Sequence, residues 1–179
     1  MIELRSVPTA ELTERDLDAM RALFAAAWPE EAYTRADWQN LLGGTHVVLE
    51  IDGRLASHAS VVDRELRIGG HALRTGYVEA MATWPELQRR GYGTRVMRRV
   101  NEHIVDRYEL GGLDTGSQTF YERLGWERWR GPTSVRTRGG ERRTPEEDGY
   151  VMILRTPSTP APLDLDAPIS CEWREGDVW

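Results

Sequence analysis

Residues 75–94 read Thr-Gly-Tyr-Val-Glu-Ala-Met-Ala-Thr-Trp-Pro-Glu-Leu-Gln-Arg-Arg-Gly-Tyr-Gly-Thr, and this stretch decides the fold. Residues 76–83 are rich in small, apolar and β-favouring residues, which predicts a largely buried strand. The strand is expected to end at Trp84-Pro85-Glu86, because proline cannot donate to a strand ladder. Residues 88–93 then open a helix with one apolar face. That face carries Val96, Met97, Val100, Ile104 and Tyr108.

A strand, a glycine loop and a helix start together form a device that binds phosphate. The first amides of a helix have no partners within the helix and lie at the positive end of its dipole. Glycine lets a pyrophosphate approach the backbone closely, and Arg89 and Arg90 add positive charge. The alternative is an ordinary turn with a solvated basic tip, because a short glycine pattern alone is weak support.

A family resemblance favours the phosphate-binding interpretation. Gln88-Arg89-Arg90-Gly91-Tyr92-Gly93 resembles the Gln/Arg-x-x-Gly-x-Gly/Ala signature of the GNAT acetyltransferases, whose loop binds the pyrophosphate of acetyl-coenzyme A (acetyl-CoA). A second hallmark, the Phe120-Tyr121 segment with Gly125-Trp126, follows at the expected separation. The resemblance implies an acetyl-CoA site. Its expected members are Met81, Ala82, Thr83, Gln88, Arg89, Arg90, Gly91, Tyr92, Gly93 and Thr94.

Composition limits the other possibilities. The 179 residues suit a single domain, and 29 acidic against 23 basic residues give a net charge of −6. This balance argues against nucleic acid and suits a cationic small substrate. One cysteine excludes an intrachain disulfide, and the four histidines lack zinc-ligand spacing, so we interpret them as structural or surface residues and expect no metal. With neither a signal peptide nor an apolar run of membrane-spanning length, we expect a cytoplasmic protein without a membrane partner.

The periodicity predicts a mixed, mostly antiparallel sheet flanked by helices on both faces, an α+β arrangement that matches the GNAT fold. Strands are expected at residues 2–7, 45–51, 54–62, 64–68, 76–83, 110–114, 126–129, 150–155 and 169–173. Helices are expected after Thr13 and Thr34, at 88–108, and at 118–124 with Ser117 as its cap. Residues 131–149 are rich in Gly, Pro, Arg and Glu and are expected to form a long loop. Residues 156–179 are expected to form a C-terminal extension that completes the substrate site.

Glu79 and Tyr121 are the candidate catalytic pair. Glu79 is a charged residue in an otherwise apolar strand, and partial desolvation would raise its pKa toward that of a general base. In the GNAT resemblance, the tyrosine of the Phe120-Tyr121 pair places its hydroxyl at the coenzyme sulfur as a general acid, and Phe120 faces the core. The alternatives are an outward-facing Glu79 and a Tyr121 that only packs. The backbone near Met81 and Thr83 would pair with the pantetheine arm.

A more specific resemblance, to one group of GNAT acetyltransferases, covers most of the chain from Asp37 onward. Segments including Tyr77-Val78-Glu79, residues 131–134 and the ending Cys171-Glu-Trp-Arg-Glu-Gly-Asp-Val-Trp179 are similar to the aminoglycoside 2′-N-acetyltransferases. This implies acetyl transfer to the 2′-amine of an aminoglycoside, and a homodimer. The implied drug-binding acids are Asp37, Asp114, Asp148, Asp177 and the α-carboxylate of Trp179. Carboxylates suit a substrate that carries several ammonium groups.

Two departures lie on the presumed substrate side. Glu31-Ala32-Tyr33 stands where the family has Gly-Asp-aromatic, so an expected acid is missing, and Glu30 or Glu31 is the candidate substitute. The segment from Leu113 to Gln118 is shorter than in the family. The pattern suggests a retained reaction with an altered substrate, for which kasugamycin is a candidate. Two alternatives stay open: acetylation of another polyamine or a protein N-terminus, and a coenzyme-A-binding regulator without turnover.

The tail is expected to take part in catalysis. Trp173, Val178 and Trp179 supply apolar surface to pin it to the domain, and Gly176 supplies a bend. Asp177 and the α-carboxylate of Trp179, which is ionised at neutral pH, would then face the substrate amine. The alternative is a frayed tail, as is usual for chain ends.

Overall fold

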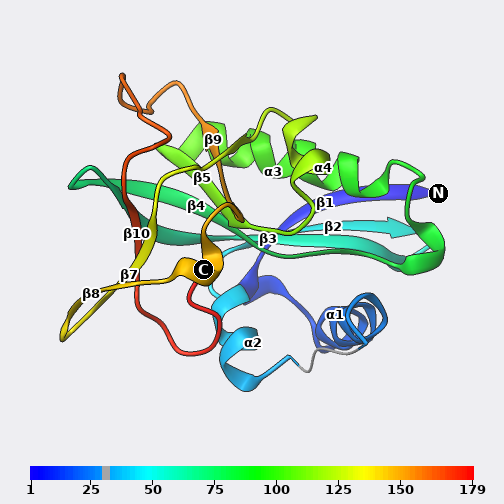
Figure 1. The fold of residues 1–179 in the computed structure, drawn as a ribbon. Helices are drawn as coiled ribbons and strands as arrows, with labels where there is room; N and C mark the ends of the chain where they lie inside the picture. Colours follow the sequence, from blue (N-terminus) through cyan, green and yellow to red (C-terminus); the bar gives the residue numbers. More distant parts are fainter. Residues whose placement is uncertain (30–32) are drawn as a thin grey trace. The chain divides into compact units, whose positions relative to one another are not determined.

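The computed structural model describes residues 1–29 and 33–179, and its chain forms two compact units (Figure 1). The first unit comprises residues 1–62 and 78–100, and the second comprises residues 63–77 and 101–179. Three elements run from one unit into the other. They are β3 (Arg54–Ile68), β4 (His71–Thr83) and α3 (Tyr92–Arg107).

The first unit is built on an antiparallel ladder of β1 (Ile2–Pro8), β2 (Thr45–Ile51) and β3. A tight hairpin joins β2 and β3. Asp52 and Gly53 both have positive φ, 50° and 73°, as the tight hairpin turn that matches strand twist requires. The short helical turn η1 (Thr9–Glu11) connects β1 to the helices that follow.

Helices α1 (Glu14–Ala27) and α2 (Arg35–Leu41) each begin with the predicted capping signal. Thr13 and Asp16 exchange side-chain and backbone hydrogen bonds in a capping box, and Thr34 and Asp37 do the same. Within the first unit, α1 and α2 lie on one side of the β1–β3 ladder and α3 lies on the other (Figure 1). The apolar faces of α1 and α2 form a core, which contains Met20, Leu23, Phe24, Leu41 and Ala82.

The second unit contains the strand order β6-β9-β5-β4-β3-β10-β7-β8. The new strands are β5 (Leu110–Asp114), β6 (Glu127–Arg128), β7 (Thr133–Thr137), β8 (Gly140–Arg143), β9 (Val151–Arg155) and β10 (Ile169–Glu172). The pairs β4–β5 and β7–β10 are parallel, and β5–β9, β6–β9, β7–β8 and β3–β10 are antiparallel. The predicted fold class, a mixed and mostly antiparallel sheet with helices on both faces, is confirmed.

The prediction of a long loop over residues 131–149 was wrong. This segment holds the β7–β8 hairpin and a short helical turn, η3 (Pro145–Glu147). The alternation of Thr133, Val135 and Thr137, followed by glycines, was a strand signal that the high charge of the segment obscured. The parallel partner of β7 is β10, more than thirty residues later in the chain, so local composition could not reveal the pairing.

Other boundaries also differ from the sequence predictions. The expected strands at 54–62 and 64–68 are one continuous strand, β3, and β4 begins at His71 rather than Gly76. The short helix α4 covers only Gln118–Glu122, and Ser117 makes no capping hydrogen bond because its backbone is outside the extended conformation of a cap. The expected apolar face of α3 is buried as predicted. Within the described part of the chain, none of the helices is long and apolar enough to cross a membrane.

Candidate active site

The glycine loop of the first unit has the geometry of a phosphate cradle. After the helical turn η2 (Pro85–Leu87), Arg89 and Gly91 take positive φ values of 60° and 82°. The carbonyl of Gly91 accepts the first hydrogen bond of α3, from the amide of Arg95. The amides of residues 92–94 therefore lie in the first turn of α3, where the backbone N–H groups have no acceptors within the helix. A Cβ built on Gly91 would meet no atom within 4 Å, so the loop is open on that side.

Side chains of β3 bind the main chain of β4 just before this loop. Ser60 donates to the Glu79 carbonyl (3.4 Å), His58 lies 3.0 Å from the Ala80 carbonyl, and Ser57 donates to the Ala82 carbonyl (2.9 Å). Ala80 has a φ of 49°, an uncommon left-handed conformation for a residue with a Cβ. The backbone of β4 is therefore irregular directly beside Glu79, whose side chain is half-buried.

The remaining expected cofactor residues occupy the same segment. Ala82 and Thr83 are buried, and Met81 is half-buried. The side-chain amide of Gln88 donates to the Thr83 carbonyl at 3.3 Å, which joins the end of the strand to the loop. This bond gives Gln88 a defined role in shaping the loop. The exposed Arg89 and Arg90 supply charge at its tip.

Tyr121 lies on α4 in the second unit and is 7% exposed. Its ring contacts Phe120 edge-on, with centroids 4.9 Å apart, and lies 6.1 Å from Trp126. Burial raises the pKa of its phenol, so the hydroxyl stays protonated at neutral pH and is available as a donor. The expectation that Phe120 would be the core-facing member of the pair was wrong, since Phe120 is half-buried and Tyr121 is buried.

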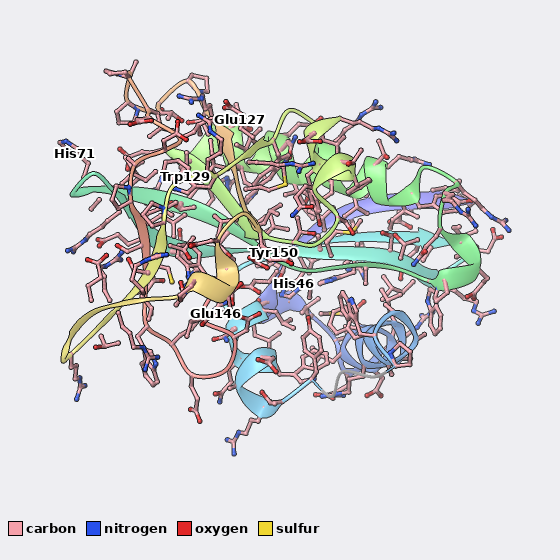
Figure 2. All side chains as sticks on the ribbon, in the orientation of Figure 1. His46, His71, Glu127, Trp129, Glu146 and Tyr150 are labelled. Carbon is pink, nitrogen blue, oxygen red and sulfur yellow. The ribbon has the colours of Figure 1, made fainter. Side chains whose placement is uncertain are left out.

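Glu147 interacts with two other acids of the second unit, Asp114 and Asp177. Glu147 on η3 has a raised pKa, mainly because of burial and the negative charge of Asp177. A hydrogen bond with Asp114, at the end of β5, acts in the opposite direction. Asp114 and Asp177 were predicted site residues. Glu147 was not among the predicted site residues, because a glutamate in a charged segment has the same sequence signal whether it is half-buried, as here, or exposed, as its neighbour Glu146 is (Figure 2).

Two other predicted acids take part in the structure of their own elements. One oxygen of Asp148 accepts from the amide and hydroxyl of Thr133 (both 2.9 Å), and the other accepts from Arg143 (2.7 Å). Burial would raise the pKa of Asp148, but these hydrogen bonds outweigh it and lower the pKa. Asp37 accepts from Thr34 in the α2 capping box. Glu30 and Glu31 lie outside the described residues.

The tail of the second unit is fixed by long-range contacts. The buried guanidinium of Arg64 donates to the carboxylate and carbonyl of Glu172 (both 3.0 Å) and to the carbonyl of Val178 (2.8 Å). It also lies over the ring of Tyr77, 4.7 Å from the centroid. These contacts connect strand β3 to both ends of residues 172–178. No local sequence signal around Arg64 predicts this role.

Trp179 is 2% exposed, and its indole donates to the Thr144 hydroxyl at 3.0 Å. Its amide donates to Asp177 (3.2 Å), and its backbone oxygen accepts from Arg174 (3.0 Å). The predicted bend is confirmed by Gly176, which has a φ of 80°. Trp173, in contrast, is 55% exposed and does not pin the tail as expected; it follows Glu172, the last residue of β10.

The mixed sheet with helices on both faces, and the strand–loop–helix element at residues 79–95, are features of a class of acyltransferases. The family model described as an acetyltransferase (GNAT) domain matches residues 9–129. The chain belongs to the GNAT acetyltransferases, and it is an acetyl-CoA-dependent enzyme. Among the described residues, no group of three His, Cys, Asp or Glu side chains is arranged to hold a metal ion.

Similar proteins refine the relationship. The chain is 39% identical to an aminoglycoside 2′-N-acetyltransferase of Mycolicibacterium fortuitum, over 98% of this chain and 91% of that protein. Escherichia coli ElaA has a similar structure, with a TM-score of 0.64 at 17% identity, covering 87% of this chain and 100% of ElaA. A GCN5-related N-acetyltransferase from Kribbella flavida has a TM-score of 0.60 at 24% identity over 73% of this chain. The match covers 35% of that structure, so the chain spans about one third of its length.

Proposed function

We propose that this enzyme transfers the acetyl group of acetyl-CoA to the 2′-amine of an aminoglycoside. The observation that carries the proposal is the interacting set of Asp114, Glu147 and Asp177. Mutual repulsion among carboxylates is relieved when a polycation binds, so a polyamine sugar is the substrate class that such a set favours. The likeness to the Mycolicibacterium enzyme supports the same substrate class and the same amine.

The roles of the loop residues follow from their geometry. Acetyl-CoA, when bound, supplies a thioester whose carbonyl carbon an amine can attack. The amides of Tyr92, Gly93 and Thr94, at the N-terminus of α3, would hold its pyrophosphate, and Arg89 and Arg90 would add positive charge. The open side of Gly91 leaves room for the phosphate oxygens. The β4 backbone near Met81 and Thr83, which follows the irregular residue Ala80, would receive the amide-bearing arm.

Two side chains would move the protons of the reaction. Glu79, as general base, would accept a proton from the substrate amine as its nitrogen forms the new bond to the acetyl carbon. As the carbon–sulfur bond breaks, Tyr121 would donate its phenolic proton to the departing sulfur. The products are the amide and the thiol of coenzyme A. The pKa of Tyr121, raised by burial, favours the protonated phenol that this role requires.

The substrate acids would be Asp114, Glu147 and Asp177, with the tail residue Trp179 beside Asp177. Asp37 and Asp148 would contribute through the elements that they fix, since both already accept hydrogen bonds from their own segments. The altered sequence at residues 31–33 supports a substrate that differs from the usual drugs of the family. We propose kasugamycin as a candidate, and antibiotic resistance as the biological role.

Thiol release from acetyl-CoA tests the proposal directly. The assay would compare 2′-amino aminoglycosides, kasugamycin, linear polyamines and peptides, with mass spectrometry to locate the new acetyl group. We expect release with at least one 2′-amino sugar and acetylation at that amine. Release only with polyamines or peptides would assign the enzyme to another GNAT substrate class. Tight coenzyme binding without any release would support the regulatory alternative.

The predicted homodimer and cytoplasmic location stay predictions. Sedimentation velocity of the purified chain would give the mass of the species in solution. Fractionation of the source cells would give the location. Neither outcome changes the assignment of the reaction, because each concerns assembly or place rather than chemistry.

A further inference from the structure

Two buried histidines of the first unit form a hydrogen-bonded chain that ends beside Glu79. His46 on β2 and His58 on β3 are both 0% exposed. The Thr9 hydroxyl lies 2.8 Å from Nε2 of His46, and Nδ1 of His46 lies 2.9 Å from Nε2 of His58. Nδ1 of His58 lies 3.0 Å from the carbonyl oxygen of Ala80. None of these hydrogen bonds has a role in the acetyl transfer proposed above.

The direction of every hydrogen bond in this chain follows from its last acceptor. A carbonyl oxygen can only accept, so Nδ1 of His58 carries a proton. In a neutral imidazole the other nitrogen is then an acceptor, so Nε2 of His58 accepts from Nδ1–H of His46. By the same reasoning, Nε2 of His46 accepts from the Thr9 hydroxyl. Burial lowers the pKa of His46 to about 4. Burial, together with repulsion from a protonated His46, lowers the pKa of His58 to about 3. Both rings are therefore neutral near pH 7.

The acceptor at the end of the chain is an unusual backbone unit. Ala80 has a positive φ, a conformation that a residue with a Cβ adopts only when its surroundings hold it. It lies between Glu79 and Met81, so its conformation sets the direction of the Glu79 side chain. A second side-chain bond to this part of β4, from Ser60 to the Glu79 carbonyl, is longer at 3.4 Å. The ring of Phe24 packs edge-on against His58, with centroids 5.4 Å apart, and limits its movement.

We propose that His58, oriented by His46, is a positioning residue that holds the Ala80 irregularity of β4 and thereby orients Glu79. The inference rests on the proposed role of Glu79 as the base. Two imidazoles are costly to bury unless their nitrogens are satisfied, and here each ring nitrogen has one partner. These hydrogen bonds therefore link Thr9, which follows β1, and His46, which lies on β2, to one backbone carbonyl of β4.

Two substitutions of His58 separate the two bonds that it makes. Asn places its amide nitrogen near the position of Nδ1, so His58→Asn can keep the bond to Ala80 while losing the bond from His46. Gln reaches toward the position of Nε2, so His58→Gln can keep the contact with His46 while losing the bond to Ala80. Both variants should lower the melting temperature. We expect His58→Gln to lower kcat by roughly 10–100-fold relative to His58→Asn, because a small misplacement of a catalytic group is costly.

A stability-matched control and a rescue variant complete the comparison. Leu41→Val, in the buried core of the first unit, should lower the melting temperature without a change in kcat. Ala80→Gly in the His58→Gln background should restore part of the lost kcat, because glycine adopts positive φ without the Cβ penalty. The KM for acetyl-CoA should change little in the His58 variants. Equal kcat for His58→Asn and His58→Gln, or losses that only follow melting temperature, would overturn the proposal.

A measurement that needs no turnover keeps this inference separate from the proposed function. Carbon-13 NMR of the Glu79 carboxyl would give its pKa in each variant. We expect His58→Asn to keep the wild-type pKa and His58→Gln to shift it. If the wild type acetylates no aminoglycoside but this difference is seen, the substrate proposal fails and the positioning role stands. If the pKa is the same in all variants, the positioning role fails whatever the substrate.

Discussion

The proposed coenzyme segment at residues 88–94 and the tail at residues 169–179 are built by opposite means. In the coenzyme segment the defining bonds are local: Gln88 reaches back to Thr83, and the Gly91 carbonyl accepts from Arg95. In the tail, Arg64 binds a carbonyl 114 residues away, and the Trp179 indole binds a hydroxyl 35 residues away. The conformation of the first region is therefore set by neighbouring residues, and the conformation of the tail is set by residues far away in the chain.

Because of this difference, the two regions should tolerate different substitutions. A local turn loses little entropy on folding and keeps its shape after a distant substitution. A segment held by distant donors loses its position when one donor is removed, although its own sequence is unchanged. The proposed pyrophosphate loop at residues 88–94 should therefore respond mainly to changes within its own segment, and the proposed substrate site should respond to changes far from it in sequence.

The largest expected effect comes from the proposed base. Glu79→Gln should lower kcat/KM by about 10²–10⁴-fold and remove the ascending limb of its pH profile, because an amide cannot accept the proton. Steady-state rates from pH 5 to 10 would measure this change. Glu50→Gln, at another half-buried strand glutamate of the first unit, is the control. An unchanged limb in Glu79→Gln would assign it to the substrate amine or another group.

Tyr121→Phe tests the other proton-transfer role and should have a similar or somewhat smaller effect. Loss of a general acid typically costs about 10²–10⁴-fold, and protonation of the sulfur by solvent would reduce the loss. We expect kcat to fall more than the KM of either substrate changes. Tyr150→Phe, at an exposed tyrosine of the second unit, should leave kcat unchanged (Figure 2). Normal kcat with chemistry shown to be rate-limiting would remove Tyr121 from the mechanism.

Gly91→Val should break the local region alone. A β-branched residue fits poorly at a φ of 82°, and its side chain would occupy the open side of the loop. Loss of one charge-assisted hydrogen bond of about 1.5–3 kcal/mol would weaken acetyl-CoA binding roughly 10–100-fold by calorimetry. Gly70→Val is the matched control, since Gly70 has a φ of 86° and equally open space. Unchanged affinity in Gly91→Val would exclude the loop as the pyrophosphate site.

Arg64→Met should break the long-range region alone. It removes the donors to the carbonyls of Glu172 and Val178 and should cost about 1–3 kcal/mol of stability. We expect a raised KM for the aminoglycoside with unchanged acetyl-CoA affinity, which is the reverse of Gly91→Val. Arg67→Met, at an exposed arginine of the same strand, is the control. Equal loss of both affinities would show that the two regions are not independent.

The smallest expected effect concerns acid, which should act oppositely on the two units. The pKa values of His46 and His58 fall from 6.5 to about 4 and about 3, so the unfolded chain binds these protons first and stability is lost below pH 6.5. The pKa of Glu147 is raised above 4.5, so its contribution to stability decreases as pH rises through the folded pKa. Glu147→Gln should therefore raise the melting temperature near pH 7 while weakening aminoglycoside binding.

Urea titrations at pH 4.5, 5.5, 6.5 and 7.5 would measure both contributions. The gain from Glu147→Gln should shrink toward pH 4.5, where the wild-type carboxyl also becomes neutral. His58→Asn should reduce the loss of stability between pH 6.5 and 4.5. A pH-independent gain in the Glu147 variant would show that repulsion from Asp177 does not contribute to folding stability.

The sequence by itself determined the parts of this protein whose partners are close in the chain. The capping boxes at Thr13 and Thr34, the turn at Asp52-Gly53, the buried face of α3 and the loop at Gly91 all follow from residue types within one or two turns of each other. For the same reason the GNAT signature at Gln88–Gly93 was recognisable without any coordinates.

Only the tertiary structure decided which polar residues meet. The pairing of β7 with β10, the contact of Glu147 with Asp114 and Asp177, and the chain from Thr9 through two histidines to Ala80 join residues far apart in sequence. A carboxylate or imidazole has the same sequence signal whether it is solvated, caps a helix or is buried with a partner. Burial and hydrogen bonding fix its charge and its role, and both depend on the folding of the whole unit around it.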